Sequence, residues 1–177
     1  MHFAKKTIIS LALTALIAGC SDSDSPDAVM PDPADPPMPV NYRYEVTVVN
    51  LTHGQPMSPI AALLHNESTI WTIGESASTA LEQLAESGDN SELLAESFVL
   101  AGASGTGMLM PGASESIEVV ITDMQPQLFS MVTMLVNTND AFSGVNALDL
   151  SNMEVGESIS MRTSSYDAGT EKNSESS

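Results

Sequence analysis

Two segments of this chain alternate apolar and polar residues, which is the pattern of a strand with one buried face. The segments are 42–50 and 116–123, and the residues predicted to face inward are Tyr44, Val46, Val48, Ile117, Val119 and Ile121. A third segment, 128–137, is apolar on both faces and predicts a central strand of a sheet. Such strands need an apolar layer on one or both sides, so we expect a layered β structure.

Shorter apolar runs add to this prediction. They predict strands or extended segments at 60–65, 69–73 and 155–163, the last with Ile159 and Met161 on one face. Many short strands, joined by turns that contain Gly and Pro, favour an antiparallel β-sandwich with one or two short helices.

The first of these helices is predicted at 77–86 and the second, shorter one at 91–98. The first has an apolar stripe at helical spacing, formed by Leu81, Leu84 and Ala85. Ser78 or Thr79 can cap its start, and Thr79 would form a capping box with Glu82. Gly88 is expected to end it.

Composition divides the chain into three regions. Residues 1–19 contain two lysines and then about twelve apolar residues, too few to span a bilayer, and are predicted to be a signal peptide. Residues 20–40 start with the only cysteine and are rich in Pro and Asp, which predicts a disordered linker. Residues 41–174 remain as one domain, long enough to bury a core without disulfides.

The boundary between the first two regions, Leu-Ile-Ala-Gly-Cys, resembles the lipobox of bacterial lipoproteins. The resemblance implies cleavage before Cys20 and acylation of this residue, for example with palmitate. Several acyl chains anchor a protein stably, because each buried methylene contributes about 0.8 kcal/mol. Ser21 in the next position favours the outer membrane by resemblance to a bacterial sorting rule. The alternative is an ordinary signal peptide with a chance cysteine.

The charge of the chain is strongly negative. After loss of the first 19 residues, three basic residues would stand against 23 acidic ones, a net charge of −20. Nucleic-acid binding needs clustered Lys and Arg, so we expect no nucleic-acid partner. The acidity favours solubility in a salty medium, or affinity for divalent cations, which prefer carboxylate oxygens.

An enzymatic role is not expected. His53, Ser58 and Asp140 include the residue types of a hydrolytic triad. However, the sequence has neither the Gly-x-Ser-x-Gly nor the His-Glu-x-x-His motif, and His53 falls in a loop rich in Gly and Pro.

Two further motifs are more specific when they occur together: Asn-Asp-Ala-Phe-Ser-Gly at 139–144 and Tyr-Asp-Ala-Gly-Thr-Glu at 166–171. With the loop at 50–59, they resemble bacterial members of the spondin N-terminal domain family, which also occurs in F-spondin and mindin. The resemblance runs from about Tyr44 to Asn173. It implies a C2-like β-sandwich that holds a calcium ion at one end.

The resemblance also implies the calcium ligands. The aspartates of the two motifs correspond to Asp140 and Asp167, and Glu118 is the best match for a third ligand, with Glu115 as the alternative. Converging carboxylates repel each other unless a cation lies among them. The other interpretation is that Asp140 and Asp167 only stabilise turns.

The resemblance implies a calcium-binding module for adhesion, displayed in the bacterial envelope, with an extracellular protein or glycan as its ligand. The alternatives are a structural envelope lipoprotein and a truncated copy without a dedicated ligand, because family domains usually continue beyond the second motif.

Overall fold

The computed structural model describes residues 2–4, 37–66 and 69–170. The predicted lipid site at Cys20 and most of the predicted linker lie outside these ranges. Within them, no helix has the length and the apolar composition needed to cross a membrane.

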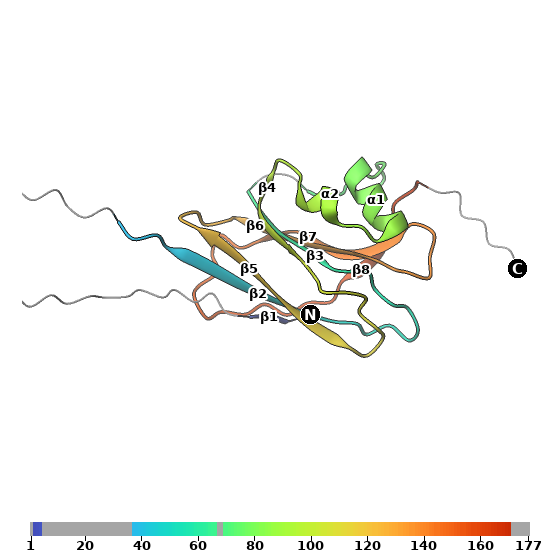
Figure 1. The fold of residues 1–177 in the computed structure, drawn as a ribbon, viewed down its shortest axis with the longest axis horizontal. Coiled ribbons are helices and arrows are strands. Elements are labelled where there is room, and N and C mark those ends of the chain that lie inside the picture. The colour runs from blue at the N-terminus through green and yellow to red at the C-terminus, as the bar shows by residue number, and fades with distance from the viewer. Residues whose placement is uncertain (1, 5–36, 67–68, 171–177) are drawn as a thin grey trace, which may run out of the picture.

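The described strands form two antiparallel sheets (Figure 1). The three-stranded sheet has the order β1-β2-β5, with bounds His2–Ala4, Asn41–Val49 and Ser114–Thr122. The five-stranded sheet has the order β4-β3-β6-β7-β8, with bounds Val99–Ser104, Ala61–His65, Leu128–Met134, Ala141–Asp149 and Ser164–Asp167. Two helices, α1 (Thr79–Ser87) and α2 (Ser91–Leu94), cover the outer face of the five-stranded sheet. The molecule is therefore a β-sandwich with two short helices, as predicted.

Two apolar clusters hold these three layers together. One lies between the sheets and includes Val46, Val119 and Phe129, and the other lies between the five-stranded sheet and the helices and includes Leu81 and Phe142. The five-stranded sheet thus has an apolar layer on each face.

The strongest sequence patterns are confirmed. Tyr44, Val46 and Val48 of β2 are buried, and so are the inward residues predicted for β5. The strand predicted to be central is β6, which lies between β3 and β7 and is buried at six of its seven positions.

The first predicted helix is also confirmed, as α1. It is capped by Ser78, whose Oγ accepts a hydrogen bond from the amide of Leu81 at 3.3 Å. Its end is set by Gly88, which has φ +74°. The capping box with Thr79 was the wrong alternative, because Thr79 is already the first residue of the helix.

Other boundaries were wrong. The segment 155–163 forms no regular strand, although Ile159 and Met161 do pack against the core. Gly156, at φ +88°, has a turn conformation there, and the next strand, β8, begins only at Ser164. The second helix is shorter than predicted, and residues 69–73, predicted as a strand or an extended segment, form no strand. Strand β4 was missed because its Gly and Ala residues have little β-propensity.

Strand β1 comes from the predicted signal peptide. It pairs with β2 opposite Glu45, Val46 and Thr47. Removal of residues 1–19 would therefore leave β2 as the edge strand of its sheet.

Candidate functional site

The pairing of β7 with β8 brings the two motif aspartates to the same end of the five-stranded sheet. Asp140 directly precedes β7, Asp167 ends β8, and Asp167 is the register partner of Ala141. The tight connection from β6 to β7 is closed by a hydrogen bond from the Leu135 amide to the Ala141 carbonyl, 2.8 Å long.

Asp140 is 2% exposed, and its hydrogen bonds connect the motif at 139–144 to the motif at 166–171. Its Oδ2 accepts hydrogen bonds from the amide of Thr170 at 3.0 Å and from its hydroxyl at 3.3 Å. Its carbonyl accepts a third from the amide of Ala168 at 3.1 Å. A buried carboxylate needs such donors, because removing it from water without hydrogen-bond partners costs free energy.

Asp167 is exposed, and its Oδ1 accepts a hydrogen bond from the amide of Gly169 at 2.8 Å. This is an Asx turn. The other end of β7 has the same arrangement, since Asp149 Oδ1 accepts from the amide of Ser151 at 2.8 Å. Hydrogen bonds from the Ser151 hydroxyl and amide hold the pKa of Asp149 below its usual value. An Asx turn like that of Asp167 therefore also forms at Asp149, which belongs to neither of the two aspartate motifs.

The structure does not bring Glu118 to this end of the five-stranded sheet. Glu118 lies in the middle of β5, in the other sheet, with its side chain 54% exposed. It forms an ion pair with Arg43, with 3.1 Å between Nη1 and Oε1. Glu115, the alternative ligand, accepts hydrogen bonds from the amide of Thr106 at 2.6 Å and from its hydroxyl at 2.7 Å.

Calcium in proteins takes six to eight oxygen ligands. The part of the chain that the structure describes contains no group of three or more His, Cys, Asp or Glu residues placed to hold a metal. A calcium ion at this end would therefore have two carboxylates, Asp140 and Asp167, and would need main-chain, hydroxyl or water oxygens for the rest.

The residues of the considered triad have separate structural environments. His53 is exposed in its loop. Ser58 is buried, and its Oγ accepts a hydrogen bond from the amide of Met134 at 3.0 Å. Asp140 is bound to Thr170, as described above.

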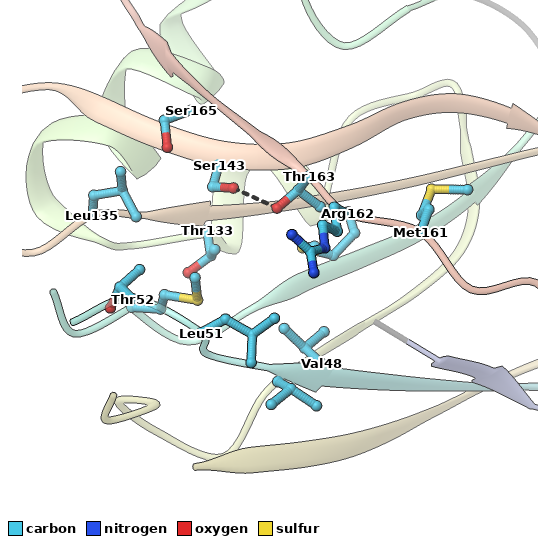
Figure 2. Close-up of a pocket in the computed structure, with 13 residues that line it drawn as sticks. Val48, Leu51, Thr52, Thr133, Leu135, Ser143, Met161, Arg162, Thr163 and Ser165 are labelled. Carbon is cyan, nitrogen blue, oxygen red and sulfur yellow. Dashed lines mark hydrogen bonds between the residues drawn. The ribbon is translucent and has the colours of Figure 1, made fainter. Parts of the chain in front are cut away.

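A cavity of about 250 Å³, which no sequence pattern predicted, lies between the two sheets. Its walls come from the end of β2, the following loop, β6, β7, the segment that leads into β8 and the start of β8 (Figure 2). The one available signal was Arg162, an isolated basic residue in an acidic chain.

No curated protein matches this chain. A family model, Spondin_N, matches residues 51–176, which is more than half of the sequence and includes both aspartate motifs. The match agrees with the fold and with the resemblance of the motifs, and the family is a binding type of module rather than a catalytic one. The chain therefore belongs to the spondin N-terminal domain family.

Proposed function

We propose that this protein is a lipid-anchored spondin-type binding module of the bacterial envelope, and that it holds calcium at the end of β7 and β8. The observation that carries the calcium proposal is the contact between Thr170 and Asp140, which joins the two motifs that resemble the calcium loops of the family. Asp167 lies in the same turn as Thr170 and adds a second carboxylate.

Bound calcium would neutralise the two carboxylates and hold the connection before β7 against the turn after β8. Both segments carry backbone carbonyls and side-chain oxygens, and calcium accepts such ligands in flexible geometry. The strong acidity of the chain favours the approach of a cation. Glu118 is not among the proposed ligands, because it lies in the three-stranded sheet and forms an ion pair with Arg43 there.

The anchoring proposal rests on Cys20 and on the composition of residues 21–40. A Pro-rich extended chain of that length reaches on the order of 60 Å, at about 3.1 Å per residue. The domain would then stand clear of the lipid surface, where an extracellular protein or glycan could reach it. Ser21 favours the outer membrane.

Thermal unfolding of the full chain tests the calcium proposal, with Cys20→Ser used to prevent lipidation. Calcium at 100 times its dissociation constant should stabilise the fold by about 2.7 kcal/mol relative to EDTA, a shift of several degrees. Asp167→Asn should abolish the shift, because the amide keeps an oxygen for the Asx turn but loses the charge. Asp149→Asn is the matched control and should keep it.

Either of two results would reject the calcium proposal. One is a midpoint that ignores calcium in the parent chain. The other is an equal calcium shift in Asp167→Asn and in the parent.

Anchoring is tested separately by labelling cells that express the chain with radioactive palmitate. The parent should carry the label and sediment with membranes, and Cys20→Ser should lose both properties. A Cys20→Ser chain that stays in the membrane fraction would show that the attachment does not depend on lipid at this residue.

A further inference from the structure

The cavity between the sheets differs from the rest of the molecule in its charge. The chain has 23 acidic residues, but none of the cavity's lining residues is Asp or Glu. It does contain Arg162, and Figure 2 shows the guanidinium of this residue turned into the space between the two walls. A lining with one arginine and no carboxylate suits this cavity to an anion.

Arg162 is available for such a role. In the described ranges the only Lys or Arg residues are Arg43 and Arg162, and the ion pair found there belongs to Arg43 and Glu118. An arginine binds a carboxylate with two parallel charge-assisted hydrogen bonds, a geometry that suits an anionic headgroup.

The remaining walls are mainly apolar. They include Val48, Leu51, Met57, Met131, Leu135 and Met161. Leu51 is 71% exposed at the rim, so a bound apolar group would cover a side chain that the protein leaves in water. Methionines adapt to ligands of different shape, because the side chain is unbranched and flexible.

Several hydroxyls that line the cavity already form hydrogen bonds within the protein. The Ser143 and Thr163 hydroxyls are 2.9 Å apart, and Ser143 also donates to the carbonyl of Ser164. Thr133 donates to the carbonyl of Ser58 at 2.9 Å. The charge of Arg162, more than any hydroxyl, should therefore select the headgroup.

The volume limits the size of the ligand. At about 250 Å³ the cavity is slightly smaller than typical sites for drug-sized ligands, which are about 300–1,000 Å³. With a water-sized group occupying about 30 Å³, it has room for on the order of eight non-hydrogen atoms, so the end of a chain as long as that of octanoate would lie at the open rim beside Leu51.

We propose that this cavity binds a small monocarboxylate with an apolar chain, such as a medium-chain fatty acid, with the carboxylate on Arg162 and the chain between Val48, Leu51 and Met131. The proposal goes beyond the calcium-binding role and does not depend on it, because the two sites use different residues.

Isothermal titration calorimetry tests it on the full chain with Cys20→Ser, using octanoate, 1-octanol and acetate below the concentration at which octanoate forms micelles. Octanoate should bind about 10- to 100-fold more tightly than octanol, the range for hydrogen bonds to a charged group. Acetate should bind much more weakly than octanoate, because it lacks the chain that fills the apolar walls.

Variants in matched pairs assign the effect to the cavity. Arg162→Gln should remove the preference for octanoate over octanol, and Arg43→Gln, at the other arginine of the described ranges, should keep it. Leu51→Asp should abolish octanoate binding, whereas Ile73→Asp, at another exposed apolar residue outside this cavity, should not. All four positions are on the surface, and the thermal midpoint of each variant checks that it folds.

The proposal is overturned if octanoate does not bind, or if octanol or acetate binds as tightly as octanoate. It is also overturned if Arg43→Gln weakens octanoate binding as much as Arg162→Gln, because the effect would then be one of net charge.

Discussion

Strands β3 and β5 have the same secondary structure but very different surroundings. All five residues of β3 are buried, because the three-stranded sheet covers one face of its sheet and the helices cover the other. Strand β5 alternates between buried and accessible residues, because only its inner face is covered. The comparison shows that the layer in which a strand lies, more than its own sequence, decides how many of its side chains contribute to stability.

The sharpest test of this comparison uses neighbouring residues on each strand. Leu63 and Leu64 are each 0% exposed on opposite faces of β3, so each Leu→Ala change should reduce the free energy of unfolding by about 2–5 kcal/mol. On β5, Val119→Ala should be clearly destabilising, whereas Val120→Ala, at a residue 39% exposed, should have an effect within about 0.5 kcal/mol.

Urea unfolding measures all four values. A Leu63→Ala change as mild as Val120→Ala would mean that the helices do not protect the outer face of the five-stranded sheet in solution.

The next largest effect is expected where strands of the five-stranded sheet approach most closely. A Cβ on Gly144 of β7 would clash with the Met131 carbonyl oxygen and would lie 3.0 Å from the Trp71 ring. Because backbone must then move, Gly144→Ala should cost about 1–3 kcal/mol, as overpacking usually does. Gly107→Ala is the control, since a Cβ there meets no atom within 4 Å. Equal thermal midpoints for the two variants would contradict the close packing of β6 and β7.

The polar contacts of the two sheets can be compared through one serine in each. Ser130 of β6 is fully buried, lies 2.9 Å from His65 Nε2 and accepts a hydrogen bond from the Ala147 amide at 2.8 Å. Ser130→Ala should cost about 1–3 kcal/mol, because it removes a partner from the buried His65 ring and from the part-buried Ala147 amide. Ser116→Ala on β5 removes an exposed contact with Thr47 and should change stability by about 0.5 kcal/mol or less. Chemical denaturation distinguishes these values, and equal losses would break the comparison.

The smallest effect is expected on the outer face of the three-stranded sheet. Glu118 pairs with Arg43 in solvent but also lies opposite Glu45 in the register of β2 and β5. Exposed ion pairs contribute about 0.2–1 kcal/mol, and opposed like charges reduce this gain. Glu118→Gln should therefore change the thermal midpoint little, and high salt should remove the difference. A loss above about 2 kcal/mol would show that this face is covered in solution.

The pattern of apolar residues in the sequence was sufficient for strands β2, β5 and β6 and for helix α1. In β2, β5 and α1 the spacing of apolar residues matches the period of the element, and in β6 a continuous apolar run marks a strand buried on both faces. Helix α1 also has local boundary signals, Ser78 at its start and Gly88 at its end. The apolar pattern failed for 155–163, where Ile159 and Met161 alternate correctly but the segment has no regular strand pairing. It also missed β4, whose small residues pair with β3.

The candidate sites also have features that the sequence predicted and features that it could not predict. The aspartate motifs could be identified from sequence because their residues, taken together, resemble those of a known family. The contact between Asp140 and Thr170, 30 residues apart, depends on the register of β7 and β8. The position of Glu118 depends on which sheet β5 joins, and neither fact follows from local spacing.

The sequence by itself determined the β class, the buried faces of the alternating strands and the family, because these depend on local periodicity and on short motifs. Only the tertiary structure decided which strands are buried on both faces, that Asp140 contacts Thr170, and that Arg162 lines a cavity with Val48, which lies more than a hundred residues away. The physical reason is that strand pairing and the stacking of layers join distant segments, and the free energy that selects them comes from burial, which no single segment contains.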